Sequence, residues 1–412
     1  MVIISNSMFY GTVLPLSSQA HSLHSLGSAA VVRDLAAMFD ALEGPGSDIN
    51  LYGYSYGTTL GYWVTQMFPE RSGKIILDGV VDPSDWALYQ PYLGWDLDIA
   101  DAEATYKGFT EACAVAGPSG CSLAKSSTET AANIDARVEG ILSSIYGSWN
   151  NASQYSQNEI TELIFTYLYQ VCWFQSYFHK QLHSLHFKPS TWKDLALFLA
   201  QFVNPGTVAR MAITIRRPLN ILHTRPVMHS LPFIKPGGSV SPQPDNDPLS
   251  GADFGAYEMY DYSIVAIFCG DSADPIGATT KDVFNEIVRV SQVVSHKFGA
   301  TFNARFFCHR WSSRAVERYQ GPFNKKPKNS VLVIGNQADP ITPFRSAKLV
   351  ASQQYLGSSA RLVQQWDFGH TSSAECRWSV YAWRRLGQPL SFFSLKLLDQ
   401  HHRELHERHP TY

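Results

Sequence analysis

Residues 49–83 read INLYGYSYGTTLGYWVTQMFPERSGKIILDGVVDP, and this stretch decides the fold class. Its pattern predicts a short buried strand over residues 47–55, a helix over 56–68 that ends before Pro69, and a second buried strand over 73–81. A strand, a helix and a strand in such quick succession are typical of a parallel crossover unit, because parallel strands need a long connection between them.

A further helix is predicted ahead of this unit. Residues 29–43 show the apolar spacing of an amphipathic helix, begin after a capping residue, Ser28, and stop at Gly44. The positions expected to share its apolar face are Val31, Leu35, Met38 and Leu42.

The same alternation returns near the C-terminal end. Strands are predicted over residues 330–336 and 361–366, with a helix over 345–354 between them and a last helix over 373–386. An α/β core therefore resumes after a long intervening segment.

That intervening segment, from about residue 90 to 325, is predicted to be mainly helical. Ser156 and Glu159 form a capping box before one helix, and Thr279 starts another. The apolar stripe of this second helix holds Val283, Ile287, Val290, Val294 and Phe298. Seven prolines between Pro218 and Pro248 predict a long loop, because no regular element tolerates them.

Composition excludes several classes of protein. The chain has 412 residues, 45% of them hydrophobic, so it can bury a large core and is neither disordered nor a coiled coil. Its 33 Lys and Arg against 35 Asp and Glu leave a formal charge of −2, which removes the electrostatic motive for binding nucleic acid or an anionic membrane. No apolar run is long enough to span a bilayer, and residues 1–20 do not read as a signal peptide. We expect no nucleic-acid partner and no membrane span.

Residues 53–57, Gly-Tyr-Ser-Tyr-Gly, form a G-x-S-x-G motif that joins a predicted strand directly to a helix. Gly53 and Gly57 would permit the strained, closely packed turn of a nucleophile elbow. Such a turn would expose the Ser55 hydroxyl at the helix N-terminus, where the backbone N–H of Tyr56 can stabilise an oxyanion. The alternative is a glycine-rich turn in which Ser55 only caps the helix.

A serine nucleophile needs a base, and the base needs an acid that fixes its tautomer. Asp339 and His370 each follow a predicted strand, so both should lie at the carboxyl ends of parallel strands, where α/β sheets place their ligands. They also follow Ser55 in the order expected for a nucleophile elbow. Asp367 competes for the role of acid and is interpreted instead as a residue that ends a strand or caps the loop.

The histidine-rich end of the chain raises the hypothesis of a metal site. These histidines stand among arginines and glutamates, so a solvated helix end is the preferred interpretation, and we expect no metal and no cofactor. The residues concerned are His401, His402, His406 and His409.

Six cysteines leave two interpretations open. In an oxidising compartment four of them would form two local disulfides, whereas in a cytosol all would be buried thiols. The expected pairs are Cys113 with Cys121 and Cys269 with Cys308, which leaves Cys172 and Cys376. The sequon at Asn151 permits glycosylation.

Three separated stretches together resemble a known family. Residues 49–83 look like the elbow region of the secreted α/β-hydrolases related to tripeptidyl aminopeptidases, and residues 331–350, VLVIGNQADPITPFRSAKLV, with WDFGHTSS at 366–373, look like their TAP-like C-terminal segment. The spacing of the four paired cysteines is similar to positions in the same group. The resemblance implies Ser55 as nucleophile, Asp339 as acid and His370 as base.

The resemblance also implies an architecture: an α/β-hydrolase core with a mostly parallel sheet and a large helical cap. Residues 1–90 would be the N-terminal part of the core with the elbow, 91–325 the cap, and 326–412 the C-terminal part of the core and a polar tail. It further implies a secreted serine hydrolase that releases short peptides from free N-termini through an acyl-enzyme, or a carboxylesterase of the same fold. The sequence leaves the oligomeric state open, and a monomer is the preferred interpretation. If the substrate is a peptide read from its amino end, an acid in the cap should pair with its ammonium group. Asp271 and Asp274 are the candidates, and an exposed loop acid is the preferred interpretation of both.

The chain departs from this family before the elbow. Only 54 residues precede Ser55, and they contain no glycine-rich loop to supply a second oxyanion donor. The N-terminal strands of the usual sheet are expected to be missing, which would leave the elbow strand at an edge. We expect an N-terminally incomplete version of a secreted precursor or, as the alternative, a shortened paralogue with weak or lost catalysis that serves as a binding scaffold.

Overall fold

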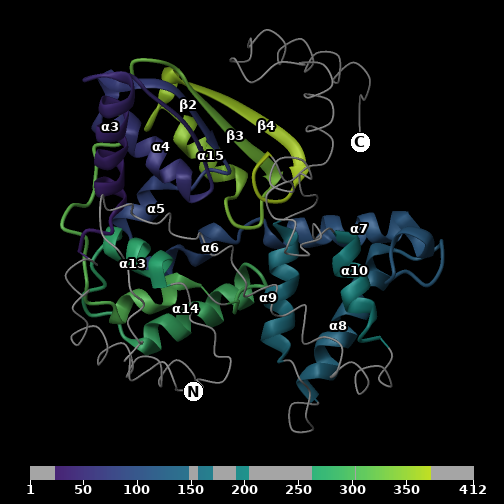
Figure 1. The fold of residues 1–412 in the computed structure, drawn as a ribbon. Coiled ribbons are helices and arrows are strands. Elements are labelled where there is room, and N and C mark those ends of the chain that lie inside the picture. Colours follow the sequence, from purple (N-terminus) through teal and green to yellow (C-terminus); the bar gives the residue numbers. More distant parts are fainter. Residues whose placement is uncertain (1–23, 148–155, 170–191, 204–261, 302, 373–412) are drawn as a thin grey trace, which may run out of the picture.

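The fold is built on a four-stranded parallel sheet (Figure 1). The computed structural model describes residues 24–147, 156–169, 192–203, 262–301 and 303–372. The strands are β1 (Ile49–Tyr54), β2 (Ser72–Asp78), β3 (Val331–Ala338) and β4 (Ala360–Phe368). They pair in the order β1-β2-β3-β4, and every pair is parallel. The predicted α/β class is confirmed, since β2 and β3 pair directly although the helical segment separates them in sequence.

Two crossover helices cover one face of the sheet. Helix α4 (Tyr56–Met67) joins β1 to β2 and packs on both, and α15 (Phe344–Ala351) does the same for β3 and β4. Because crossovers between parallel strands are right-handed, strands in sequential order place both helices on the same face. The rings of Tyr62 in α4 and Tyr355 beyond α15 accordingly meet, with centroids 6.3 Å apart.

Helix α3 (Ser28–Glu43) packs on α4 through a face other than the predicted one. Its buried side chains are those of Ser28, Ala29, Val32 and Ala36. Met38 and Leu42 are instead 56% and 76% exposed, so their assignment to the apolar face was wrong. Small residues form the contact because they allow two helices to approach closely. The N-cap is Gly27 rather than Ser28, and the helix ends at Gly44 as predicted.

The prediction of a buried elbow strand holds for one face of β1 and is wrong for the other. β1 lies at an edge of the described sheet, and Tyr52 and Tyr54 are 51% and 63% exposed. Burial therefore alternates along β1, as it does in any strand with only one covered face.

Helices occupy the described parts of residues 91–325, where no strand occurs. They are preceded by the short helix α5 (Pro83–Leu88). The order is α6 (Trp95–Asp98), α7 (Ala102–Gly120), α8 (Ala131–Gly147), α9 (Gln157–Leu168), α10 (Trp192–Ala200), α13 (Tyr262–Asp271) and α14 (Thr280–Val293). The predicted capping box at Ser156 and Glu159 is present, and Thr279 caps α14 through Asp282. The Pro218–Pro248 stretch and the predicted helix over 373–386 lie outside the described residues.

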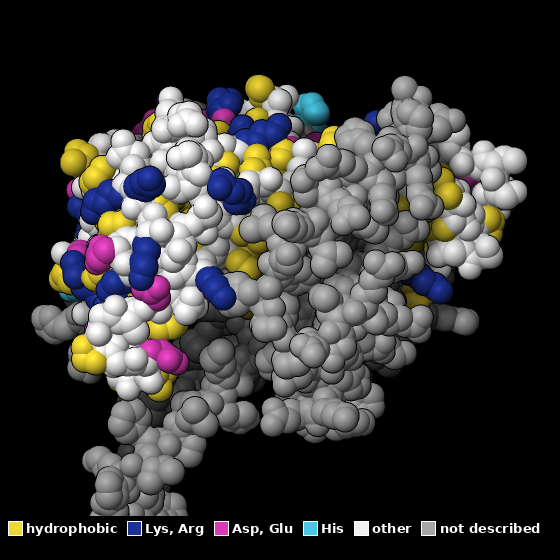
Figure 2. Space-filling view, turned by 90° about the horizontal axis from the view of Figure 1, so that it is seen from above, with side chains coloured by type: hydrophobic (Ala, Val, Ile, Leu, Met, Phe, Trp, Pro, Cys, Tyr) yellow, Lys and Arg dark blue, Asp and Glu magenta, His cyan; other side chains and the backbone are white. Residues whose placement is uncertain are grey.

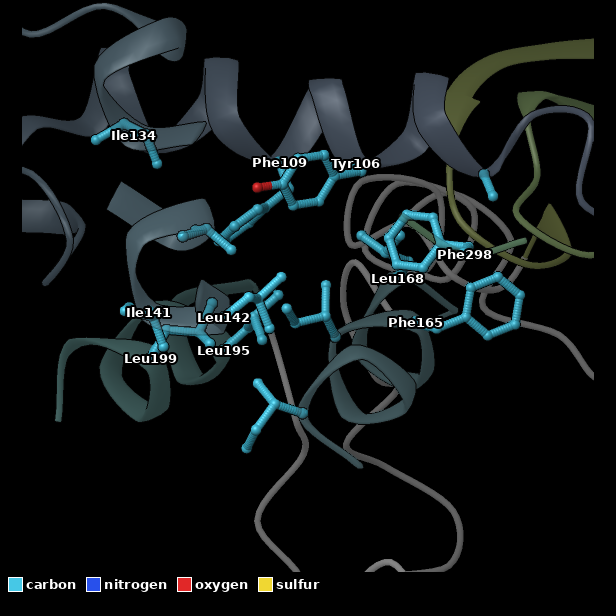
Figure 3. Packing of buried hydrophobic residues seen from close by; sticks show 14 of the residues in the cluster. Tyr106, Phe109, Ile134, Ile141, Leu142, Phe165, Leu168, Leu195, Leu199 and Phe298 are labelled. Carbon is cyan, nitrogen blue, oxygen red and sulfur yellow. The ribbon is translucent and has the colours of Figure 1, made fainter. Parts of the chain in front are cut away.

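The helical segment has a hydrophobic cluster of its own (Figure 3). Side chains from α7, α8, α9 and α10 converge in it, joined by Phe298 and by the predicted stripe of α14. A second cluster joins the sheet to α3, α4 and α15, and it also takes in α13 and Trp311. α13 therefore packs with the sheet, although its sequence lies inside the segment expected to form the cap.

A buried cluster of charges lies between the short helices and residues 304–310. Arg305, only 3% exposed, donates to Asp98 Oδ2 over 2.7 Å, to Asp85 Oδ2 over 2.6 Å and to the Pro91 carbonyl oxygen over 3.2 Å. Its guanidinium also lies 4.4 Å from the ring centroid of Phe268. These contacts tie α5, α6 and α13 together.

Both expected disulfides are formed. Cys113 pairs with Cys121 and Cys269 with Cys308, whereas Cys172, Cys376 and Asn151 lie outside the described residues. No described helix is long and apolar enough to cross a membrane. Among the described side chains, no three His, Cys, Asp or Glu residues gather into a possible metal site, and the four histidines near the C-terminus are outside this set. Seen from above (Figure 2), Lys and Arg side chains are dispersed among acidic and hydrophobic ones over the described part of that face.

Candidate active site

Ser55 occupies a strained turn between β1 and α4. Its backbone has φ 55° and ψ −129°, a conformation that residues other than glycine adopt at a cost of roughly 1–3 kcal/mol. The turn is held from both sides: the Ser55 N–H donates to the Asp78 carbonyl oxygen over 3.0 Å, and the Ser55 carbonyl accepts from the N–H and the hydroxyl of Thr58. This is the geometry that a nucleophile elbow requires.

The two glycines of the motif differ in their surroundings. A Cβ placed on Gly53 would lie 2.2 Å from the Gly57 carbonyl oxygen, so the close approach of strand and helix needs a glycine at position 53. A Cβ on Gly57 would meet no described atom within 4 Å. The prediction that close packing requires a glycine is therefore confirmed at Gly53 and wrong at Gly57.

Tyr56 begins α4, so its backbone N–H has no acceptor inside the helix. Its side chain points into a separate network. The Tyr56 hydroxyl lies 2.9 Å from Ser28 Oγ, its ring centroid lies 5.2 Å from that of Trp86, and burial raises the pKa of Tyr56 to about 12. Only the backbone N–H of Tyr56 is thus available as an oxyanion donor, and we identify no second donor among the described residues.

Asp339 and His370 come together at the carboxyl ends of β3 and β4. Nδ1 of His370 lies 3.0 Å from Oδ2 and 3.1 Å from Oδ1 of Asp339. The carboxylate is wholly buried and also accepts from the N–H groups of Ile341 and Thr342 and from the Thr342 hydroxyl. An imidazole that donates from Nδ1 to a carboxylate keeps Nε2 free to act as a proton acceptor.

The charge of Asp339 is maintained against its burial. Burial alone would raise the pKa of this carboxyl, but the positive charge that His370 can carry, the hydrogen bond from His370 and those from Thr342 outweigh it and lower the pKa below its usual value. Asp339 therefore stays ionised and can stabilise an imidazolium.

The free nitrogen of His370 lies on the rim that carries the elbow. Nε2 is buried and has no hydrogen-bond partner, and no hydrogen bond joins it to Ser55 Oγ in the described structure. Gly79 connects the two residues in space: it follows Asp78, the partner of the Ser55 N–H, and a Cβ placed on it would lie 3.3 Å from Cε1 of His370. Catalytic hydrogen bonds often tighten only when substrate binds, so the open geometry is compatible with a serine–histidine pair.

Tyr169, just beyond α9, reaches His370 from the helical segment. Its carbonyl oxygen accepts from the His370 N–H over 3.0 Å, and its ring meets the imidazole edge-on with centroids 5.1 Å apart. Burial, and the nearby charge of Asp339, raise the pKa of Tyr169. The helices of residues 91–325 thus contribute directly to the walls around His370.

The alternative acids have other partners. Asp367 lies at the end of β4, as one of its two interpretations predicts; it accepts from the neighbouring Phe368 N–H, and no described hydrogen bond joins it to His370. Asp271 is buried and accepts from Ser28 and from Trp86 Nε1, and Asp274 pairs with Arg314 and Arg318. Both acids therefore have structural partners, through both oxygens of Asp271 and through Oδ1 of Asp274. Binding of a substrate ammonium group by either stays a prediction.

Two buried polar residues near His370 were not predicted from the sequence. Asp78, at the end of β2, accepts from Ser372, and Asn336 Nδ2 donates to the carbonyl oxygens of Gly369 and Thr371, each over 2.7 Å. A polar residue at the carboxyl end of a buried parallel strand is a signal that could have found both.

Residues 293–380 match the family described as TAP-like protein. The chain therefore carries a TAP-like segment of the α/β-hydrolase fold. This TAP-like segment contains β3, β4, Asp339 and His370, and Ser55 lies outside it. Serine protease Hip1 of Mycobacterium bovis, and the proteins of the same name from two strains of Mycobacterium tuberculosis, are 44% identical to the chain over 63 residues. The match spans 15% of this chain and 12% of the length of these relatives.

Proposed function

We propose that the protein is a serine hydrolase in which Ser55 is the nucleophile, His370 the base and Asp339 the acid that orients it. The observation that carries the proposal is the His370 imidazole, which Asp339 fixes through Nδ1 while Nε2 remains without a partner, next to Gly79 of the segment that follows the Ser55-binding residue Asp78. The similarity to relatives named serine protease supports the same chemistry.

The proposed reaction proceeds through an acyl-enzyme. His370 Nε2 takes the proton of the Ser55 hydroxyl as Oγ attacks the substrate carbonyl, and the Tyr56 N–H stabilises the oxyanion that forms. The imidazolium then gives its proton to the leaving group, and a water activated by the same nitrogen hydrolyses the ester. Asp339 remains ionised throughout, as its lowered pKa favours.

The proposed substrate is a short peptide cleaved from a free N-terminus, as the family resemblance implies. A carboxylesterase of the same fold is the second candidate, because the acids considered for the ammonium group, Asp271 and Asp274, have structural partners. The third candidate is a binding scaffold with weak or lost catalysis, which the lack of a second oxyanion donor in the described structure favours.

The domain division and the cellular location remain part of this proposal. We infer that residues 91–325 form a cap over the site, supported by the contact of Tyr169 with His370, with α13 as the part that shares the hydrophobic cluster of the sheet. We infer an extracellular location, supported by the two disulfides, since such bonds persist in oxidising compartments.

A fluorophosphonate probe tests the chemistry on the full chain. We expect the wild type to be labelled at Ser55 and the Ser55→Ala variant to remain unlabelled. A folded wild type that takes no label contradicts the hydrolase and favours the scaffold. Tripeptidyl substrates with free and with acetylated N-termini, compared with p-nitrophenyl esters, then distinguish the peptidase from the esterase, because only the peptidase should require the free amino group.

A further inference from the structure

Asp78 is in contact with both halves of the proposed catalytic apparatus. It ends β2 and is wholly buried. Its backbone carbonyl accepts from the Ser55 N–H over 3.0 Å. Its carboxylate accepts from the Ser372 N–H over 2.8 Å, from Ser372 Oγ over 2.5 Å and from the Tyr52 hydroxyl over 2.6 Å. One residue thus binds the elbow and the loop that carries His370.

The loop held by Asp78 is itself strained. Thr371, between His370 and Ser372, has φ 68°, a left-handed conformation that a β-branched residue rarely adopts. Such conformations persist where surrounding contacts enforce them. Here Asn336 holds the two carbonyl oxygens that flank His370, and Asp78 holds Ser372 immediately after the strained residue.

The two clamping residues approach from one side of the sheet. Side chains two residues apart in a strand share a face, so Asp78 lies with Ile76, opposite Leu77, whose side chain contacts Gly61 of α4. In β3, Asn336 likewise lies opposite Gly335, which faces α15. The clamp therefore acts from the face that α4 and α15 leave uncovered.

We propose that Asp78 is a positioning residue that sets His370 against Ser55, its carbonyl fixing the elbow and its carboxylate fixing the histidine loop. This inference rests on the proposed hydrolase. The competing explanation is that Asp78 only fastens the edge strand β1 through Tyr52. The two roles use different hydrogen bonds of the same carboxylate, so they can be separated.

The test compares two variants that each remove one hydroxyl from Asp78. Ser372→Ala loses the bond on the histidine side and keeps the backbone N–H, while Tyr52→Phe loses the bond on the edge-strand side. We expect Ser372→Ala to slow fluorophosphonate labelling of Ser55, and to lower kcat for a p-nitrophenyl ester, roughly tenfold with KM unchanged, because small misplacements of catalytic groups have large effects on rate. Tyr52→Phe should keep the labelling rate within about twofold, and Ser372→Thr, which retains the hydroxyl, should restore most of it.

Asp78→Asn extends the test, with an expected loss of roughly a hundredfold in the same labelling rate. Melting temperatures show how much of each variant is folded, and Ser372→Ala gives the answer if Asp78→Asn does not fold. The positioning role is overturned if Ser372→Ala and Tyr52→Phe slow labelling equally. It is also overturned if the labelling rate falls only in proportion to the folded fraction. In that case the wild type still labels and the proposed hydrolase stands, whereas a wild type that does not label overturns both.

Discussion

The chain buries two clusters in which carboxylates meet a cationic side chain, and they differ in what is left unbonded. In the Arg305 cluster the guanidinium donates to Asp85, Asp98 and a backbone carbonyl, so the cation is fully surrounded by acceptors. In the catalytic cluster His370 gives one nitrogen to Asp339 and keeps the other, Nε2, buried without a partner. Asp85 Oδ1 in the Arg305 cluster is also buried without a hydrogen-bond partner, so an unpartnered atom alone does not mark a functional site. At His370 the unpartnered atom is a ring nitrogen that can take up a proton.

The backbone shows the same contrast. The two described residues other than glycine that have positive φ are Ser55 and Thr371, and both belong to the catalytic rim. The Arg305 cluster has charged groups in ordinary backbone. Backbone strain and an unpartnered ring nitrogen thus occur together at the His370 cluster, to which we assign a function. The Arg305 cluster has neither backbone strain nor an unpartnered cationic nitrogen, and we assign it to stability.

The largest expected effect comes from removing the charge of Asp339. In Asp339→Asn the amide would donate toward Nδ1 and favour the wrong tautomer of His370, so kcat should fall by about 10⁴-fold. Ester hydrolysis measures this loss, and the melting temperature should change little because the amide oxygen can still accept from Ile341 and Thr342. Asp367→Asn is the matched control: a comparable loss there would transfer the acid role to Asp367.

The corresponding change in the other cluster should affect stability instead. Arg305→Met leaves Asp85 buried and Asp98 partly buried without a cation, and breaking a buried pair costs about 3–5 kcal/mol of unfolding free energy. Urea unfolding measures this loss. Arg33→Met is the control, because its pair with Glu317 is exposed and should contribute below about 1 kcal/mol. Equal effects of the two variants would contradict a stabilising role specific to the buried cluster.

The acids of the two clusters should also make the unfolding free energy depend on pH with opposite sign. Burial raises the pKa of Asp98 to about 7 in spite of Arg305, whereas the pKa of Asp339 is lowered. Between about pH 4, the ordinary value for an aspartate, and pH 7, the folded state holds a proton on Asp98 that the unfolded state has lost. The contribution of Asp98 to stability is therefore present at low pH and is lost as pH rises to about 7.

Asp98→Asn should remove this slope. Urea unfolding of wild type and variant at a series of pH values measures it, and the difference in unfolding free energy should change steadily across the window from about pH 4 to 7. If the unfolding free energies of wild type and variant instead change in parallel with pH, the proton is taken up by a group other than Asp98.

Most of the fold could be predicted from local sequence patterns. The elbow unit, the returning strands and the caps at Ser156 and Thr279 were predictable because hydrophobic period and capping chemistry act over a few residues. The face of α3 was not, since Met38 and Leu42 fit the helical period as well as Val32 and Ala36 do, and only the packing partner selects between them.

The candidate site was predictable in part for the same reason. The positions of Ser55, Asp339 and His370 after strands follow from the topology of a parallel sheet, and the choice of Asp339 over Asp367 is matched by the contacts of His370. Asp78 and Asn336 were missed, because their roles depend on a strained loop that lies far from them in sequence. The structural partners of Asp271 were hidden for the same reason, since Ser28 and Trp86 come from distant segments.

The smallest effects come from methyl groups added to glycines, and they sharpen the contrast between the clusters. A Cβ on Gly53 would lie 2.2 Å from a backbone oxygen of the elbow, and one on Gly94 would lie 2.1 Å from Asp85 Oδ1 and 2.3 Å from Arg305 Nη1. Each substitution by alanine should destabilise by about 1–3 kcal/mol through overpacking. Gly53→Ala should also slow labelling of Ser55 in the protein that remains folded, because the turn itself must shift, whereas Gly94→Ala should not.

Gly57→Ala is the control for that comparison. No described atom lies within 4 Å of the added methyl, and alanine is preferred to glycine inside a helix, so unfolding free energy should rise by up to about 1 kcal/mol with labelling unchanged. Labelling kinetics and urea unfolding of the three alanine variants measure both quantities. A loss of labelling in Gly57→Ala as large as that in Gly53→Ala would mean that the second glycine of the motif is needed by the substrate rather than by the backbone of the elbow.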